Sequence, residues 1–295
     1  MTNKTLWPLF LLISLGIIWG SGYTLARYAT THGVPPLGYS FWQSVGPAMA
    51  LLVMTLIKER RISISPRHLR YYLIAGVLGI ALPNTNMYFA APHLPAGILA
   101  VIVNTVPLMM YPLALILHQE KFQYTRFFAV MLGVVGIMMI IGFKWNVPGI
   151  NSWALITLLT PLFFAMCALY SVYDRPADSS SLSLAAGMLV ASVLVLTPFL
   201  VDTLNFYPIN SFSLPNMAVM LEIVLSSIGY VILFQLLKIA GAVYYSLVGG
   251  MVAITGLFWG WLLLGETISW WTVMAVVLII VAVVTVTLIP ARQNR

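Results

Sequence analysis

The sequence predicts an all-α membrane protein of ten transmembrane helices, built as two inverted five-helix repeats around a central cavity. Composition gives the class, because 61% of the 295 residues are hydrophobic and only 7% are charged. Charged residues make up about 25% of an ordinary soluble domain. Two further observations, an internal repeat and the distribution of basic residues, indicate how the helices are arranged.

The internal repeat is a pair of apolar runs of equal length. Residues 95–120 read PAGILAVIVNTVPLMMYPLALILHQE, and residues 241–266 read GAVYYSLVGGMVAITGLFWGWLLLGE. The two align without a gap, and each ends on a glutamate, Glu120 or Glu266. Apolar runs of about 20 residues are long enough to cross the hydrocarbon core of a bilayer. Internal repeats of this kind are common in secondary transporters, which bind their substrates between the two halves.

Proline, glycine and charged residues divide the chain into ten apolar spans. The first apolar run, which begins at Leu6, is too long for the hydrophobic part of a signal peptide and has no convincing cleavage site, so we count it as a span. The third and fourth spans contain Pro83 and Pro107, which interrupt the hydrogen bonds of a helix. The expected spans are residues 7–29, 37–57, 70–91, 95–117, 125–143, 152–173, 183–202, 217–238, 242–264 and 270–289.

Basic residues lie mostly on one side of these spans. If the N-terminus is cytoplasmic, only Arg27 and Lys144 of the 14 lysines and arginines lie on the outer side. Because cytoplasmic loops carry the excess of Lys and Arg, we expect a multi-pass protein of the plasma membrane, the bacterial inner membrane, with both termini cytoplasmic. The net charge of +7 then needs no nucleic-acid partner. The cytoplasmic basic residues are Lys4, Lys58, Arg60, Arg61, Arg67, Arg70, Lys121, Arg126, Arg175, Lys238, Arg292 and Arg295.

Five spans per half make the second repeat enter the membrane from the opposite face. We expect the first repeat to cover residues 1–146 and the second, inverted repeat to cover residues 147–295. Glu120 then lies in a cytoplasmic connection and Glu266 in an outer one, as a pseudo-two-fold axis in the membrane plane requires. Such a pair of halves can exchange conformations, which gives inward-open and outward-open states of similar energy.

Several segments together resemble the EamA-type domains of the drug/metabolite transporter superfamily. The resemblance covers nearly the whole chain, and its most specific parts are Trp19-Gly20-Ser21, the small-residue start of each repeated helix, and Gly265-Glu266. It implies a ten-helix carrier with a central cavity, commonly an exporter of amino acids or other small metabolites. Relatives often have an Arg-Phe pair after an aromatic in the second helix, whereas residues 41–44 read Phe-Trp-Gln-Ser, so the resemblance implies no anionic substrate. The segments are residues 19–29, 88–122, 229–266 and 270–286.

Polar side chains within spans are costly, so we expect them to face the interior of the bundle or a water-filled cavity. Glu222, Ser226 and Tyr230 form one stripe of the eighth span. Glu222 is the only acid inside a span, and it is expected either to bind a cationic group, to carry a proton, or to be hydrated near the helix end. Arg27 is expected either to pair with Glu222 or to extend to lipid headgroups.

The other substrate-binding candidates come from the first four spans. Asn84 and Tyr88 share a face after Pro83, whereas Asn86 points elsewhere and is expected to bond a neighbouring helix. Asn104 stands near the middle of the fourth span, and its twin position is Gly250, within a series of small residues from Ser246 to Gly260 that favours close helix packing. Candidate polar and aromatic walls are Trp19, Trp42, Gln43 and Tyr111.

No motif indicates an enzyme. The chain has no Walker-type phosphate loop, no cluster with metal-ligand spacing and a single cysteine, Cys167, which excludes an intramolecular disulfide. We therefore expect no cofactor and no metal, and a secondary or facilitative carrier that exports a small metabolite such as an amino acid. A hydrophobic-cation or drug efflux carrier is the alternative, and a membrane-embedded enzyme, a lipid flippase or a channel fits less well. Expected partners are the small-molecule substrate, the lipid bilayer and protons, with the chain a monomer or homodimer.

Overall fold

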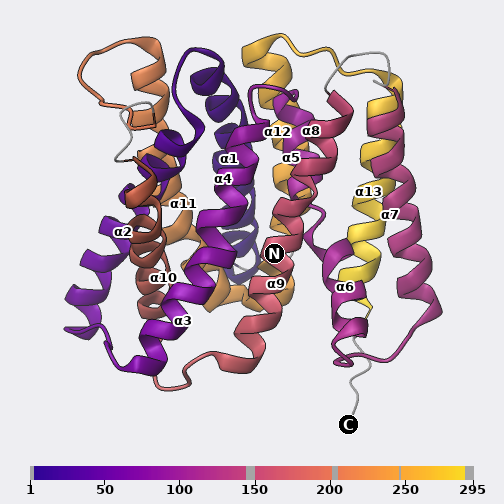
Figure 1. Ribbon diagram of the computed structural model, residues 1–295. Helices are drawn as coiled ribbons and strands as arrows, with labels where there is room; N and C mark the ends of the chain where they lie inside the picture. The colour runs from indigo at the N-terminus through magenta and orange to yellow at the C-terminus, as the bar shows by residue number, and fades with distance from the viewer. Residues whose placement is uncertain (1–2, 144–149, 201–204, 246, 290–295) are drawn as a thin grey trace.

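The computed structural model describes residues 3–143, 150–200, 205–245 and 247–289, all of which are helices and their connections (Figure 1). Nine helical segments in this part of the chain are long and apolar enough to cross a membrane, and Val248–Leu264 is a shorter apolar helix. The all-α membrane class is confirmed. The elements are α1 Asn3–Thr31, α2 Pro36–Glu59, α3 Pro66–Gly76, η1 Val77–Ala81, α4 Leu82–Ala90, α5 Ala96–Val103, α6 Val106–Ile116, α7 Tyr124–Phe143, α8 Ile150–Thr157, α9 Leu159–Asp174, α10 Ser181–Leu196, η2 Thr197–Leu200, α11 Leu214–Tyr245, α12 Val248–Leu264 and α13 Trp270–Leu288.

Two of the expected spans are interrupted where proline removes a backbone donor. The third span contains a π-helical turn, η1, just before Pro83, and such turns are frequent at functional sites. The fourth span is two helices, because Pro107 cannot donate a hydrogen bond to the carbonyl of Val103. Asn104, with φ −84° and ψ 10°, ends α5, and Val106 begins α6.

The ninth expected span, residues 242–264, is not a single helix. The element α11 is interrupted at Gly241, whose φ of 78° and ψ of 176° are not helical and whose positive φ favours glycine. Its membrane span is Leu214–Gly241, and a short helical segment follows to Tyr245, so this break falls between the expected eighth and ninth spans. A separate helix, α12, then begins at Val248. The boundary at residues 146 and 147, the outer end of the seventh span and Ser246 lie outside the described residues.

The two halves of the chain pack into each other. Helices of the first half contact helices of the second: α1 packs on α11 and α12, α2 on α10 and α11, α5 on α12, and α7 on α13. The connection from α6 to α7 lies at the lower edge of Figure 1 and that from α12 to α13 at the upper edge. Glu120 and Glu266, which lie in these connections, are therefore at opposite ends of the bundle.

Small residues set the closest helix contacts. A Cβ atom at Gly20 of α1 would lie 2.9 Å from the backbone nitrogen of Gly256, and one at Gly97 of α5 would lie 2.9 Å from the Cα of Leu257. Thr255 adds a hydrogen bond of 2.6 Å from its hydroxyl to the carbonyl of Gly16. The small residues of α12 thus form a packing seam for α1 and α5.

Candidate functional site

Glu222 of α11 is a buried acid inside the bundle. Its residue is 7% exposed, so it is not hydrated at a helix end. Its two carboxylate oxygens face α1 at Gly22, where a Cβ atom would lie 3.1 and 3.4 Å from them. The carboxylate also lies within electrostatic range of the hydroxyls of Tyr39 and Tyr88, from α2 and α4. Helices from both halves therefore meet at this carboxylate.

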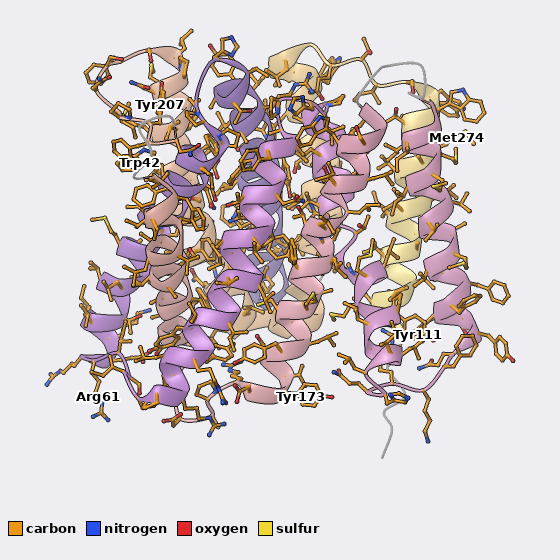
Figure 2. All side chains as sticks on the ribbon, in the orientation of Figure 1. Trp42, Arg61, Tyr111, Tyr173, Tyr207 and Met274 are labelled. Atoms are coloured by element: carbon orange, nitrogen blue, oxygen red, sulfur yellow. The ribbon has the colours of Figure 1, made fainter. Side chains whose placement is uncertain are left out.

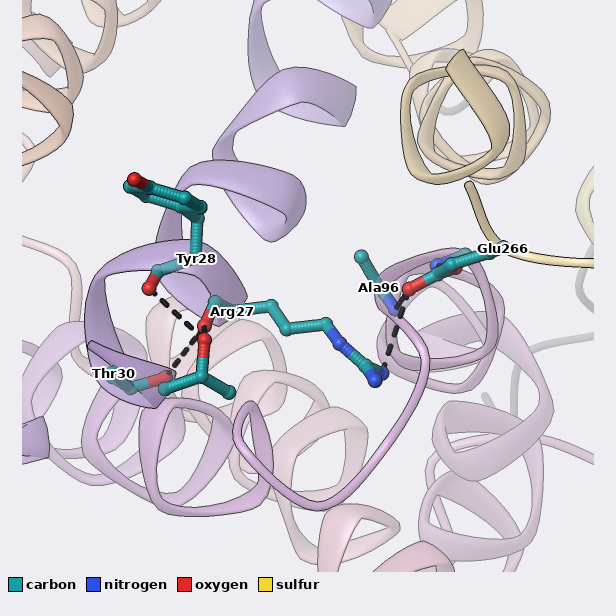
Figure 3. A network of polar contacts seen from close by, with 7 residues as sticks. Arg27, Tyr28, Thr30, Ala96 and Glu266 are labelled. Carbon is teal, nitrogen blue, oxygen red and sulfur yellow. Dashed lines mark hydrogen bonds and ion pairs between the residues drawn. The ribbon is translucent and has the colours of Figure 1, made fainter. Parts of the chain in front are cut away.

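Arg27 does not pair with Glu222. Its guanidinium lies 3.4 Å from the carboxylate of Glu266, at the end of the bundle. Glu266 also accepts hydrogen bonds from the backbone N–H groups of Ala96, at 2.6 Å, and Gly97, at 3.1 Å (Figure 3). A carboxylate is favourable there because the first N–H groups of a helix have no intrahelical acceptor. The expected pairing is wrong because the beginning of α5 holds Glu266 within reach of Arg27.

Amide and hydroxyl groups join α2, α4 and α11 beside Glu222. The side-chain amide of Asn84 donates to Gln43 at 3.1 Å. The hydroxyl of Ser226, four residues after Glu222, donates to the main-chain carbonyl of Gln43 at 3.4 Å. Asn84, Gln43 and Ser226 are 8%, 8% and 2% exposed. These three candidates from distant parts of the sequence therefore meet at one place.

Figure 1 shows the connection between α5 and α6 within the height of the bundle, and Asn104 is the residue that ends α5 there. Its amide donates to the carbonyl of Ala100 at 2.7 Å and to the hydroxyl of Tyr23 at 3.2 Å. A Cβ atom at Gly249 would lie 3.3 Å from its side-chain oxygen. Broken helices at this depth occur where protein or a cavity satisfies the backbone, and Asn104 supplies part of that satisfaction.

Aromatic rings surround the polar groups. The rings of Trp19 and Tyr230 are 6.0 Å apart, and those of Tyr39 and Tyr88 are 4.7 Å apart, both in edge-to-face arrangement. The hydroxyls of Tyr23 and Tyr230 are within electrostatic range of Tyr88. We call this set the central cluster, and its members are Trp19, Tyr23, Tyr39, Gln43, Asn84, Tyr88, Asn104, Glu222, Ser226 and Tyr230.

Two of the predicted site residues lie away from the central cluster. The indole of Trp42 donates to the carbonyl of Tyr207 at 2.8 Å, near the upper edge of the molecule (Figure 2). Tyr111 lies near the lower edge, where its hydroxyl receives a hydrogen bond of 2.8 Å from the N–H of Gln123. The guanidinium of Arg126 covers its ring at 4.8 Å and pairs with Glu120. Trp42 thus bonds the connection that precedes α11, and Tyr111 bonds the connection between α6 and α7.

Two members of the cluster, Tyr23 and Tyr39, are missing from the sequence-based candidates. Each lies four residues from a candidate, Tyr23 from Trp19 and Tyr39 from Gln43, so helical spacing was a signal that could have found them. Tyr39 is 0% exposed, and its buried hydroxyl has no hydrogen-bond partner. The hydroxyl of Thr24, which is 2% exposed, is also buried and has no hydrogen-bond partner.

The side chains of the central cluster are of the kinds that bind a small molecule. Within the described residues, no three His, Cys, Asp or Glu side chains are grouped so as to hold a metal. The cluster contains one acid, amides, hydroxyls and rings, and none of the ion pairs found among the described residues includes Glu222. The arrangement offers hydrogen bonds, an aromatic surface and one carboxyl group to a small molecule.

Comparisons with known proteins agree on the type of protein. The family described as "EamA-like transporter family" matches this chain twice, over residues 6–142 and 151–288. The protein of Escherichia coli (strain K12) called "Uncharacterized inner membrane transporter YedA" is 28% identical over 307 residues, which cover 98% of this chain and 93% of that protein. "Protein PecM" of Dickeya dadantii (strain 3937) is 26% identical over 218 residues, 72% of each. One solved crystal structure shares the fold, with a TM-score of 0.63, 15% identity and coverage of 95% of this chain and 96% of that one.

Proposed function

This chain belongs to the EamA-like transporter family and is a transporter, not an enzyme, and we propose that it is a secondary carrier that exports a small organic solute. In this proposal the two inverted halves alternate between states open to either side of the bacterial inner membrane, and the central cluster lies in a central cavity between them. The relative from Escherichia coli, named as an inner membrane transporter, supports the location. Both termini are then cytoplasmic, and the halves are residues 1–146 and 147–295.

The observation that carries this proposal is the position of the central cluster. Its groups come from α1, α2, α4, α5 and α11 and thus from both halves of the chain. It lies beside the break between α5 and α6, and binding sites of transporters built from repeats typically lie at such discontinuous helices near the midplane. Polar side chains at this depth are costly and are retained for function.

The contacts of Glu266 indicate how one side of the bundle is closed. Glu266 joins the beginning of α5 to the end of α12 through two backbone hydrogen bonds and also holds Arg27 of α1. The close seam of Gly97 with Leu257 lies next to it. We therefore infer that the outer side is closed in this conformation and that opening it requires Glu266 to release α5.

The twin acid, Glu120, supplies the counterpart at the other face. It pairs with Arg126 of its own half. From the sequence repeat, we expect Glu120 to reach the N–H groups that follow Gly241 in the other state, as Glu266 accepts from those that follow Pro95 here. In the outward-open state of our proposal, Glu120 caps the helical segment after Gly241 while Glu266 is free, so that the two halves exchange roles.

Counterflow in proteoliposomes tests the carrier function. Purified protein is reconstituted with one unlabelled solute inside, and uptake of the labelled solute is followed without ATP, over a panel of amino acids, amines and neutral aromatic metabolites. We expect a saturable, transient accumulation for at least one solute. Uptake that needs ATP, or that rises linearly with concentration as through a channel, would show that the chain is not a secondary carrier.

The orientation is tested by sided labelling of cysteines. In a Cys167→Ser background, Ser63→Cys in the connection from α2 to α3 should react with a membrane-impermeant maleimide only after cells are permeabilised. Asn210→Cys, in the connection before α11, is the matched control and should react in intact cells. The reverse pattern would invert the proposed topology.

Asn104 tests where the solute binds. Asn104→Leu removes a side-chain oxygen that we propose accepts a hydrogen bond from the solute, and a buried hydrogen bond contributes about 1 kcal/mol, so we expect roughly 5-fold weaker half-saturation. The loss of the amide's bonds to Tyr23 and Ala100 should lower the melting temperature as well. Asn86→Leu is the control, because its amide bonds the carbonyl of Ile156 and the hydroxyl of Thr160, both at 2.9 Å, as expected of a helix-to-helix contact. It should lower the melting temperature and leave half-saturation unchanged. Equal flux in wild type and Asn104→Leu would argue against this placement.

A further inference from the structure

We propose that the central cluster binds the ammonium group of an organic amine, with Glu222 as its counter-charge and the surrounding aromatic rings as its walls. This inference rests on the proposed function and narrows its substrate class. An amino acid, which the sequence favours first, also carries an ammonium group, and the two classes differ in whether a carboxylate accompanies it.

The first argument is that Glu222 has no cationic partner. Taking a carboxylate out of water is strongly unfavourable unless an opposite charge or hydrogen-bond donors compensate it. Arg27 of α1 is held by Glu266, and none of the ion pairs found among the described residues includes Glu222. A bound cation would supply the missing charge.

The second argument is that a second acceptor beside Glu222 suits an ammonium group. Such a group donates up to three hydrogen bonds, and the hydroxyl oxygen of Tyr39 is buried and without a partner in this conformation. Tyr39 is within electrostatic range of Glu222. The carboxylate and this hydroxyl together are acceptors for a cationic donor.

The third argument is the ring system. Faces of Trp and Tyr rings attract cations, and a desolvated contact of this type contributes more than an exposed one. Tyr39 and Tyr88 form one edge-to-face pair and Trp19 and Tyr230 another. An amine with an aromatic or aliphatic body fills such a site with both its charge and its apolar surface.

The absence of a basic group near Glu222 separates amines from amino acids. The carboxylate of a zwitterion needs a cation or several N–H donors when it leaves water. The described residues of the central cluster include no Lys, Arg or His, and the amide of Asn104 already donates two hydrogen bonds within the protein. A solute with an ammonium group and no carboxylate therefore fits the cluster better.

Binding to purified protein tests this inference independently of transport. A ligand that binds the folded state raises its melting temperature. The probes are 2-phenylethylamine, its trimethylammonium analogue, phenylalanine and 3-phenylpropionate, which share a phenyl body and differ in charge. We expect stabilisation by the two cations, at least 10-fold weaker binding of phenylalanine, and none of phenylpropionate.

Four variants locate the effect. Glu222→Gln is isosteric and should weaken binding of both cations at least 10-fold while keeping the melting temperature of the unliganded protein; Glu222→Asp should restore part of the affinity. Trp42→Phe, away from the cluster, is the control and should bind as wild type does. If Glu222→Gln unfolds the protein, Tyr39→Phe, expected to weaken binding several-fold, decides instead.

The outcomes that would contradict the inference are the following. Equal stabilisation by the anion, no stabilisation by either cation, or unchanged binding in Glu222→Gln would show that Glu222 is no ammonium site. Loss of pH-gradient-driven flux in Glu222→Gln with cation binding intact would make it a proton carrier only. Failure of the proposed function looks different, because cations would then bind the purified protein without any counterflow in proteoliposomes.

Discussion

Glu266→Gln is expected to open the outer side of the protein. The change removes the charge that holds Arg27 and weakens the two hydrogen bonds to Ala96 and Gly97. Charge-assisted hydrogen bonds contribute about 1.5 to 3 kcal/mol each to the state in which they form. A loss of about 2 kcal/mol from the closed state shifts the balance of the two states roughly 30-fold.

Reactivity of a cysteine in the seam measures that shift. Ala100 is 0% exposed and lies beside Gly256, so Ala100→Cys in a Cys167→Ser background should react slowly with an impermeant reagent from outside. Adding Glu266→Gln should raise the rate roughly 30-fold, and adding Arg27→Gln should raise it less, because the backbone hydrogen bonds remain. The twin change, Glu120→Gln, is the matched control and should not raise the rate. An equal rate with and without Glu266→Gln would show that this network does not close the outer side.

Gly20→Val is expected to destabilise the protein strongly. Its Cβ would lie 2.9 Å from the backbone nitrogen of Gly256 and would also overlap the hydroxyl of Thr255, which donates to Gly16. Backbone atoms cannot rotate away, so α1 and α12 must separate. Overpacking costs about 1–3 kcal/mol and the lost hydrogen bond about 1 kcal/mol, and the melting temperature in detergent should fall by several degrees.

A second glycine serves as the control for that substitution. Gly142, near the end of α7, is exposed, and a Cβ atom added there would meet no other atom within 4 Å. Gly142→Val makes the same chemical change in a helix and should shift the melting temperature far less. Similar losses in both variants would mean that helix propensity, and not the seam between α1 and α12, accounts for the effect of Gly20→Val.

The helices were largely predictable from the sequence because hydrophobic length is set by the bilayer. The second span, expected at residues 37–57, is the helix Pro36–Glu59, and the last, expected at 270–289, is Trp270–Leu288. The breaks were less predictable. Pro107 marks the interruption of the fourth span, and the break at Gly241 falls between the expected eighth and ninth spans. The start of α12 at Val248, within the expected ninth span, has no proline or charged residue beside it that would mark it.

The polar residues of the candidate site were predictable from the sequence, and the residues that pair with one another were less so. Burial cost alone selected Glu222, Asn84 and Asn104, and the structure brings them into one cluster. The pairing of Arg27 with Glu266 depends on how α5 and α12 pack, which one sequence does not give. Trp42 was ranked with the site for its ring, yet its indole N–H finds the carbonyl of Tyr207, a contact with a connection 165 residues away.

A reversible cross-link across the seam of α5 and α12 tests alternating access most directly. Gly97 and Leu257 are in close contact, so Gly97→Cys with Leu257→Cys, in a Cys167→Ser background, should form a disulfide on oxidation, after the small separation of α5 and α12 that a Cβ at Gly97 requires, and hold the outer side closed. The measurement is counterflow in proteoliposomes before oxidation, after it and after reduction, with each single cysteine as control. The account predicts that flux stops in the oxidised double variant and returns with a reductant. Full flux while the cross-link is shown to be intact would contradict it, because transport would then not require this seam to open.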